Sequence, residues 1–171
     1  AETVALAGTQ DADGFKWSEK EIKEQQIVMD YLEELLHNRS IYEYGKTGPY
    51  TLKVGNLVHL KTRYNLSLEE LKGNTGELLA GLHPTPAVCG LPRNKAYDLI
   101  RKVEKHYRRF YTGFLGPWNL EGKSQLYVNL RCALLSAGKM SLFVGGGFTT
   151  ESRPEAEWKE TETKARTLLS V

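Results

Sequence analysis

Residues 18–37 read SEKEIKEQQIVMDYLEELLH, and this stretch marks the first long element of the fold. Ser18 followed by Glu21 is the signature of a capping box, in which two residues satisfy each other's backbone N–H groups at the start of a helix. Apolar residues then recur three and four positions apart, as they do along one face of a helix. The members of this face are Ile22, Val28, Met29, Leu32, Leu35 and Leu36. The pattern predicts an amphipathic helix that ends at about His37.

The segments on either side of this helix carry strand patterns. Residues 3–9 are mainly apolar and contain Gly8 near their end, as a strand that runs into a tight turn would. Residues 42–64 begin with glycines and a proline and continue with alternating apolar residues. Glycine and proline are typical of loops and alternation is typical of strands, so this segment is predicted to be a loop followed by one strand.

The remaining chain mixes helices and strands. A short helix is predicted over residues 68–79, and Pro92 introduces another that continues at helical spacing to Tyr107. Strands are predicted near residues 110–118, 124–135 and 139–144. Ser152 and Glu155 form a second capping-box pattern, which opens a final helix. Because helices and strands do not alternate one by one, the predicted fold class is α+β.

Composition argues against several classes of partner. The 171 residues include 23 Lys and Arg and 21 Asp and Glu, and the net charge of +2 is too small to favour nucleic acid or an anionic membrane. No apolar run approaches the roughly 20 residues of a membrane-spanning helix, so we expect a cytoplasmic location. Cys89 and Cys132 lie in no metal-binding pattern, and both are predicted to be reduced thiols.

Two Glu-x-x-Glu pairs stand near the starts of predicted helices, Glu21 with Glu24 and Glu157 with Glu160. Each pair shares one helix face because its members are three residues apart. Acidic residues favour a helix N-terminus electrostatically, so solvated helix-start acids are one interpretation. The other is a magnesium site, because magnesium takes oxygen ligands and uses one or two carboxylates together with an anionic group of the substrate.

Four further features also carry two interpretations each. Glu160 and Lys164 have the spacing of a surface ion pair, but Lys164 could also point into a cleft and bind a carboxylate. Arg131 lies in a strand-like run. Its side chain is either solvated or offers a bidentate fork to a carboxylate. The glycines at 145–147 form either a turn or an anion-binding nest of backbone N–H groups. His83 is by itself more often a packed or surface histidine than a reactive one.

In their order along the chain, several short motifs resemble those of the chorismate-binding enzymes. They are residues 6–9 (LAGT), 18–24 (SEKEIKE), 82–87 (LHPTPA), 111–113 (YTG), 130–132 (LRC), 142–147 (LFVGGG) and 158–164 (WKETETK). The resemblance spans nearly the whole chain and is strongest from Leu82 onward. It implies that residues 1–171 are the C-terminal portion of a single catalytic domain, with mixed or antiparallel sheet strands packed with helices.

The resemblance also implies a magnesium cofactor and its ligands. Glu24 and Glu160 would hold the ion, with Glu21 and Glu157 supporting it directly or through water. The ion would bridge to the ring carboxylate of chorismate, and Lys164 would help to neutralise the charge on that side.

The same resemblance implies the contacts to the rest of the substrate. Arg131 and Tyr111 would engage the enolpyruvyl carboxylate together with backbone N–H groups around Gly145 and Gly147. The other predicted substrate contacts are Gly8, Thr9 and His83. A nearly neutral protein must concentrate such groups in one cleft to bind a small dianion.

The residues after His83 select the implied reaction. Residues 84–87 (PTPA) resemble the stretch that follows this histidine in isochorismate synthases. Anthranilate and aminodeoxychorismate synthases carry H-P-[AS]-G-T there. The reaction is conversion of chorismate to isochorismate by water attack at ring C2 with loss of the C4 hydroxyl, which needs a general base and a general acid. In the family these are a lysine and a glutamate N-terminal to the LAGT turn. Neither is assigned here, His83 is kept as a catalytic candidate, and we expect the chain alone to be inactive.

Other interpretations stay open. A salicylate synthase or another chorismate-utilising enzyme would have a similar site, and a non-catalytic module would carry these charges as surface groups. The motifs do not distinguish menaquinone from siderophore or salicylate biosynthesis. Strands without pairing partners would leave open edges, so we also expect the chain to self-associate.

Overall fold

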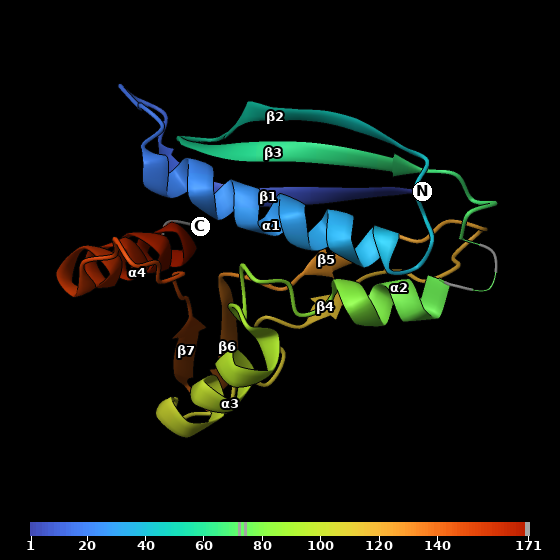
Figure 1. Cartoon of the computed structure of the whole chain (residues 1–171). Helices are drawn as coiled ribbons and strands as arrows, with labels where there is room; N and C mark the ends of the chain where they lie inside the picture. The colour runs from blue at the N-terminus through green and yellow to red at the C-terminus, as the bar shows by residue number, and fades with distance from the viewer. Residues whose placement is uncertain (72, 74, 170–171) are drawn as a thin grey trace. The chain divides into compact units, whose positions relative to one another are not determined.

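The computed structural model describes residues 1–71, 73 and 75–169 of the chain. The chain divides into two compact units, unit 1 at Ala1–Cys89 and unit 2 at Gly90–Val171. Each unit has its own helices and sheets (Figure 1). That the whole chain belongs to one domain stays a prediction.

Unit 1 contains a three-stranded antiparallel sheet covered by a long helix. The strands are β1 (Glu2–Asp11), β2 (Tyr44–Val54) and β3 (Leu57–Leu66), in the order β1-β3-β2. The helix α1 (Glu19–His37) runs along the sheet (Figure 1). A second helix, α2 (Thr75–Leu82), is tied to α1 by a 2.6 Å hydrogen bond that the Tyr31 hydroxyl donates to the Gly81 carbonyl.

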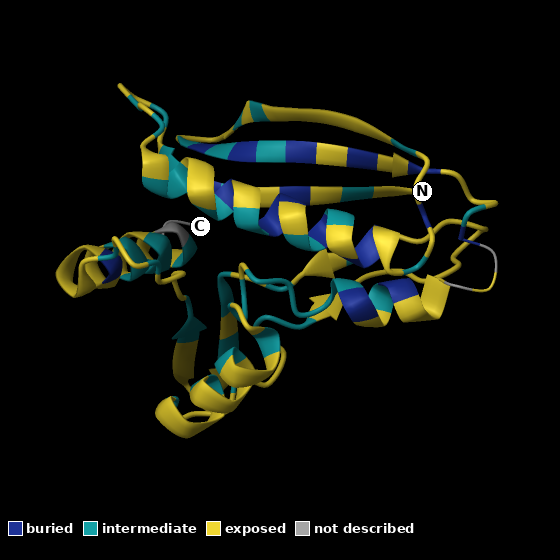
Figure 2. Cartoon of the chain, in the orientation of Figure 1, coloured by how far each residue is buried: buried dark blue, intermediate teal, exposed yellow. Residues whose placement is uncertain are grey.

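The hydrophobic core of unit 1 lies between α1 and the sheet. Buried positions recur along α1 and alternate along β3, as Figure 2 shows. The largest fully buried apolar side chains are Leu32, Leu36, Ile41, Val58 and Tyr64. Removing apolar surface from water contributes about 25 cal/mol per Å², so this layer is the main source of stability in unit 1.

The helix α1 confirms the prediction made from its capping box. Ser18 is the N-cap, and the Glu21 carboxylate accepts hydrogen bonds from the Ser18 N–H, at 2.9 Å, and from the Ser18 hydroxyl. The predicted apolar face is buried from Val28 onward, but Ile22 is 53% exposed, so its predicted burial is wrong. The buried position in this part of the helix belongs instead to Gln25, whose amide bonds to the sheet.

Residues 42–64 belong mainly to a hairpin of two strands, so the predicted loop and single strand are wrong. β2 and β3 pair antiparallel across a tight turn. Gly48 and Pro49, which suggested a loop, lie inside β2 where the register with β3 shifts. A Cβ at Gly48 would lie 2.6 Å from the Lys61 carbonyl oxygen, so glycine is needed for the two strands to approach at this irregularity.

The short helix predicted over residues 68–79 begins later, at Thr75, and ends at Leu82. Residues 72 and 74, inside the predicted range, lie outside the described residues. Residues 68–71 form turns rather than a helix. Leu71 and Leu78 are both buried in the same core.

Unit 2 contains helices and two small antiparallel sheets. Its helices are α3 (Arg93–Val103) and α4 (Pro154–Leu169). Its strands are β4 (Phe114–Leu115), β5 (Tyr127–Val128), β6 (Cys132–Ser136) and β7 (Lys139–Phe143), paired as β4-β5 and β6-β7. With the antiparallel sheet of unit 1, these elements confirm the α+β class.

Two predicted boundaries in unit 2 are wrong for backbone reasons. α3 ends at Val103 rather than near Tyr107, because Glu104 has extended backbone with ψ 122°. The strand predicted over residues 124–135 is divided into β5 and β6. Arg131 lies between them with φ 48°, and a continuous strand does not allow a positive φ.

The second predicted capping box is not formed. α4 begins at Pro154, so Ser152 lies one residue too early to be its N-cap. Proline is favoured at the first position of a helix, where its missing N–H has no intrahelical partner to lose. The Ser152 hydroxyl instead donates a 2.7 Å hydrogen bond to the Glu157 carboxylate.

Burial differs between the two units. In the described part of unit 2 the buried side chain is Glu157, and every buried hydrophobic residue of the described chain belongs to unit 1. No helix in the described ranges is long and apolar enough to cross a membrane. A cytoplasmic location stays a prediction.

Candidate functional site

Gly8 and Thr9, predicted to line a substrate ring, lie where β1 is irregular. The pairing of β1 with β3 shifts register between Ala7 and Thr9, and Gly8 has φ 68°. A Cβ at Gly8 would lie 3.1 Å from Cβ of Glu21, so α1 approaches β1 closely at this point. Glycine therefore serves both the positive φ and the close approach of the helix.

His59 was not among the predicted site residues, but the structure places it beside both of them. It pairs with Thr9 across the β1–β3 ladder. Its Nδ1 atom lies 3.1 Å from Oγ1 of Thr9 and 3.2 Å from the Gly8 carbonyl oxygen. The sequence gives no motif around His59, and only the strand register could have identified it.

The α1 carboxylates have different surroundings. Burial raises the pKa of Glu21, but the hydrogen bonds from Ser18 outweigh it and hold the pKa below the ordinary value of 4.5. Glu24, one turn further along, lies 3.8 Å from the Lys20 ammonium group. The capping box therefore uses one carboxylate of the pair structurally, while the other is in a looser i,i+4 ion pair.

In unit 2 the structure brings several predicted residues together around Gly145. A Cβ at Gly145 would lie 2.7 Å from the Tyr111 hydroxyl oxygen, so only glycine allows that contact. The Lys164 ammonium group donates a 3.1 Å hydrogen bond to the Gly145 carbonyl and lies 2.6 Å from a Glu160 carboxylate oxygen. Lys164 thus forms the predicted ion pair and also reaches the glycine segment. We call Tyr111, Gly145, Glu160 and Lys164 the Gly145 cluster.

Glu157 adjoins this cluster from the start of α4. Its side chain is 3% exposed, and its Oε1 atom accepts the hydrogen bond from Ser152. A Cβ at Gly146 would lie 3.5 Å from Oε2 of Glu157, so the glycine segment passes close to the carboxylate. A buried carboxylate is costly unless other groups compensate its charge, which makes Glu157 more than a solvated helix-start acid.

Tyr111 is held by ring contacts. Its ring centroid lies 5.8 Å from that of Phe143 on β7, and the Arg108 guanidinium lies 5.9 Å from the Tyr111 centroid. Arg108 is fixed in turn by Glu104, whose two carboxylate oxygens accept hydrogen bonds of 2.8 and 2.5 Å. Burial raises the pKa of Tyr111 above its ordinary value, so the phenol stays protonated and can donate a hydrogen bond at neutral pH.

The other predicted residues of unit 2 are placed by the backbone. Arg131 immediately precedes Cys132, which pairs with Phe143, so it lies at the same end of the β6–β7 hairpin as Gly145. A Cβ at Gly147 would meet nothing within 4 Å, so this glycine has room around it. All three residues at 145–147 are described, and none has a positive φ. An αR–αL nest needs one residue with left-handed backbone, so these glycines do not form a nest of that kind. His83 belongs to unit 1 and directly follows α2.

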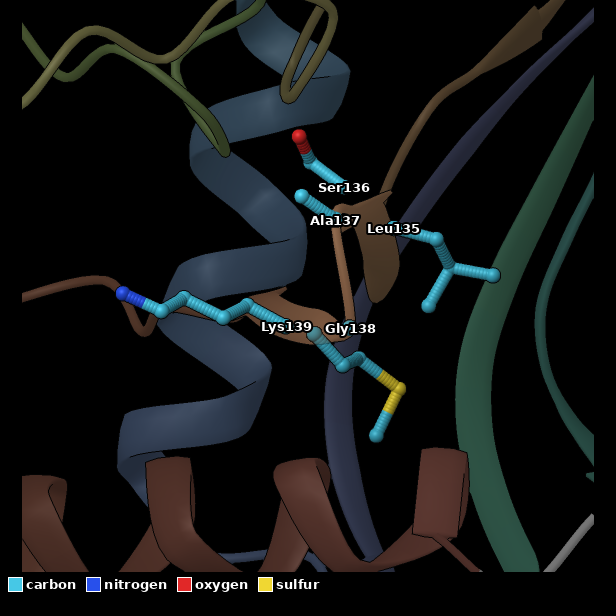
Figure 3. A pocket seen from close by; sticks show the side chains of 6 residues that line it. Leu135, Ser136, Ala137, Gly138 and Lys139 are labelled. Atoms are coloured by element: carbon cyan, nitrogen blue, oxygen red, sulfur yellow. The ribbon is translucent and has the colours of Figure 1, made fainter.

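Two cavities in the described chain lie apart from these clusters. One, of about 360 Å³, is formed by the β6–β7 turn at residues 135–140, where Leu135 and Lys139 point to opposite sides (Figure 3). The other, of about 260 Å³, lies in unit 1 and is lined mainly by apolar side chains between Trp17 and Leu60. None of the predicted substrate or metal residues lines either cavity.

The carboxylates have the chemistry that a magnesium site requires, but each unit supplies only two of them. In the described ranges, no three His, Cys, Asp or Glu side chains gather in a group that could hold a metal ion. Magnesium needs only one or two protein carboxylates and keeps several waters. The buried carboxylate of Glu157 and the neighbouring Glu160 are hard oxygen donors of the required kind, so the residues fit the ion.

Comparisons with known proteins identify relatives of this chain. A family model described as "Chorismate binding enzyme" matches residues 7–171. The vibriobactin-specific isochorismate synthase of Vibrio cholerae is 32% identical over 152 residues, which are 89% of this chain and 38% of that protein. Isochorismate synthase EntC of Escherichia coli is 34% identical over 158 residues, which are 90% of this chain and 39% of that protein.

The fold has solved relatives as well. The menaquinone-specific isochorismate synthase MenF of Escherichia coli matches with a TM-score of 0.80 and 28% identity, over 98% of this chain and 41% of that one. The chain thus spans about two fifths of the length of these relatives. Because the family model covers almost every residue, the chain belongs to the chorismate binding enzymes.

Proposed function

We propose that this chain is part of an isochorismate synthase, which converts chorismate to isochorismate with magnesium as cofactor. The observation that carries the proposal is the Gly145 cluster, in which a phenol, an ammonium group and a carboxylate gather around one glycine. Chorismate is a small dianion, and the phenol and the ammonium group are donors of the kind that bind carboxylates in a confined site. The relatives described above carry this activity in their names.

In unit 2 the chain's residues would bind the substrate's carboxylates. The Tyr111 hydroxyl, at the edge of Gly145, would donate to the enolpyruvyl carboxylate together with the Arg131 guanidinium and the N–H groups around Gly145 and Gly147. Lys164, fixed between Glu160 and the Gly145 carbonyl, would compensate the charge at the ring carboxylate. Two hydrogen-bonding partners restrict the ammonium group to one region, which lowers the entropy lost on binding.

Magnesium would be held by Glu24 and Glu160, with Glu21 and Glu157 in support. When bound, it would neutralise the ring carboxylate and so favour the binding of a dianion. Glu21 is engaged by Ser18, so a supporting role through water suits it better than direct ligation. The Ser152 hydroxyl orients Glu157, as groups behind metal-binding carboxylates commonly do.

Unit 1 would contribute the surface that meets the ring. Thr9 and Gly8 present a hydroxyl and a carbonyl oxygen next to the His59 imidazole, which adds a titratable group to that surface. The residue that activates water for attack at C2 and the residue that protonates the leaving C4 hydroxyl stay unassigned. His83 stays a candidate for substrate binding or catalysis.

The test is isochorismate formation from chorismate, with and without magnesium, by this chain and by a longer version that is extended at the N-terminus. We expect only the longer version to be active, and only with magnesium. Turnover by the 171-residue chain alone would contradict the expected inactivity. Salicylate as the product of the longer version would replace the reaction with that of a salicylate synthase.

Matched variants test the assigned residues. Glu160→Gln and Glu24→Gln in the longer version are expected to raise the magnesium concentration needed for half-maximal activity by about tenfold or more. Glu162→Gln on α4 and Glu19→Gln on α1 remove exposed carboxylates of the same helices and serve as controls. If chorismate binding were unchanged in both site variants and in Arg131→Gln, a non-catalytic module would be the better interpretation.

We also infer that the 171-residue chain self-associates through unit 2. Large apolar side chains there are widely exposed, and the short strands of its two-stranded sheets leave unpaired edges. Sedimentation velocity should give species larger than a monomer, and Phe110→Ser with Leu135→Ser should reduce their amount. A single monomeric species at all concentrations would contradict this inference.

A further inference from the structure

Gln25 is the buried polar residue that connects α1 to β1, and the sequence motifs do not single it out. Its side chain is 1% exposed. Its Oε1 atom accepts a 3.0 Å hydrogen bond from the Ala7 N–H, and its Nε2 atom donates to the Ala5 carbonyl at 3.2 Å and to Oγ1 of Thr62 at 3.0 Å. These three bonds engage both the oxygen and the nitrogen of one amide that is almost fully buried.

These bonds lie just before the irregular position in β1. Ala7 is the last residue before the register shift, and Gly8 follows it with φ 68°. Beyond the shift, Thr9 resumes pairing opposite His59. Because the Gln25 amide holds the backbone of Ala5 and Ala7, β1 has a fixed position just before the register shift.

The same residue is fixed relative to the α1 carboxylates. Glu24 precedes Gln25 in the chain, and Glu21 lies one turn earlier on the same helix face. At that turn the Gly8 position approaches Cβ of Glu21 to 3.1 Å. α1 therefore contacts β1 at two successive turns, through Gly8 at one and through the Gln25 amide at the other.

We propose that Gln25 is a positioning residue that sets Gly8 and Thr9 relative to Glu21 and Glu24. This rests on the proposed function as far as the effect on chorismate is concerned, but the positioning itself concerns only unit 1. An apolar residue of similar size would leave the Ala7 N–H, the Ala5 carbonyl and the Thr62 hydroxyl without this partner. The backbone before Gly8 would then be free to move against α1.

Amide hydrogen exchange in the 171-residue chain tests the positioning without any assay of activity. Gln25→Met is compared with Gln26→Met, because Gln26 is exposed on the same helix and bonds only along it, to Asp30. We expect Gln25→Met to speed exchange of the Ala7 amide about fivefold to tenfold relative to the other β1 amides. Equal acceleration of all unit 1 amides, or none at Ala7, would overturn the proposal.

A measurement on the unaltered chain covers the case in which Gln25→Met does not fold. The side-chain NH2 protons of Gln25 should exchange at least about tenfold more slowly than those of Gln26, because they are buried and bonded to Ala5 and Thr62. Equal rates for the two side chains would overturn the proposal.

In the longer version, Gln25→Met should affect the use of chorismate more than the dependence on magnesium. Gln25→Met should lower kcat/KM for chorismate by about tenfold to a hundredfold through misplacement of Gly8 and Thr9. The magnesium dependence should change less than about twofold, because Glu24 and Glu160 keep their side chains. Parallel losses in both would indicate general unfolding and overturn the positioning role. If the unaltered longer version were inactive, the proposed function would fail, while the exchange results would still decide the position of Gln25.

Discussion

Unit 1 and unit 2 differ in where their apolar side chains lie. Unit 1 buries a continuous layer of leucine, valine, isoleucine, methionine and tyrosine between α1 and its sheet. In the described part of unit 2, aromatic and aliphatic side chains are exposed, among them Phe110 at 82% and Trp158 at 69%. A domain needs a buried core to offset the entropy lost on folding. Unit 1 has such a core of its own, whereas the described part of unit 2 is held by polar contacts, ring contacts and short sheets.

The difference also separates two kinds of predicted site residue. Gly8, Thr9 and the α1 carboxylates stand on a packed scaffold whose geometry the core fixes. The Gly145 cluster stands on backbone that is held by its own hydrogen bonds and ring contacts. Unit 2 is therefore the part whose site geometry should depend most on what else packs against it.

The largest expected effect comes from removing core volume. Leu32 is 1% exposed and Leu135 is 74% exposed. Leu32→Ala should lower the free energy of unfolding of unit 1 by about 2–5 kcal/mol, because it removes buried methyl groups and leaves a cavity. Leu135→Ala, in unit 2, should change the free energy of unfolding of that unit by less than about 0.5 kcal/mol. Urea unfolding followed by circular dichroism measures both, and similar losses for the two variants would remove the distinction between the units.

A smaller effect is expected at the helix starts. Glu21→Ala removes the carboxylate that accepts both hydrogen bonds from Ser18 and should cost about 1 kcal/mol. Glu155→Ala, at the corresponding place in the second sequence pattern, should cost no more than about 0.5 kcal/mol, because that capping box is not formed. Unfolding curves of the two variants measure these losses. A larger loss of unfolding free energy for Glu155→Ala than for Glu21→Ala would contradict the assigned start of α4.

The long elements could be predicted from the sequence because each follows from local chemistry. α1 combines a capping box with a regular apolar face, and α3 follows a proline at its N-cap, so their starts could be predicted. The hairpin β2–β3 could not, because Gly48 and Pro49 are typical of loops, and only the register shift in the pairing, with Gly48 close to the Lys61 backbone, explains their place in a strand. Strand register is a property of two segments, and a pattern within one segment does not contain it.

The candidate site also contains residues that motifs predict and residues that only the three-dimensional pairing reveals. Motifs predicted Tyr111, Gly145, Glu160 and Lys164, and the structure brings these four together. Motifs did not predict His59 or Gln25, because their partners are 50 and 18 to 37 positions away in the chain. No local signal distinguishes such residues from an ordinary strand histidine or a solvated glutamine on a helix.

The next effect is a dependence on pH at the rim of the unit 1 core. Burial raises the pKa of Glu33, but hydrogen bonds from Lys46, at 2.6 Å, and from the Tyr64 hydroxyl, at 2.8 Å, hold it below its ordinary value of 4.5. A lowered pKa in the folded state means that the stabilisation is complete above pH 4.5 and is lost as pH falls through the lower folded value. Melting temperatures from pH 7 to pH 3 should therefore fall less for Glu33→Gln than for the unaltered chain. A parallel fall in both would mean that Glu33 does not contribute.

The smallest effect is expected from the corresponding ion pair in unit 2. The hydrogen bonds from Arg108 hold the pKa of Glu104 below its ordinary value although burial raises it, so Arg108→Met should raise that pKa toward 4.5. Titration of the Glu104 carboxyl by NMR measures this shift. Because both side chains of the pair are partly exposed, it should contribute less than about 1 kcal/mol, and high salt should weaken it about as much as it weakens the comparably exposed Glu33–Lys46 pair. An unchanged Glu104 pKa in Arg108→Met would mean that Arg108 does not lower it.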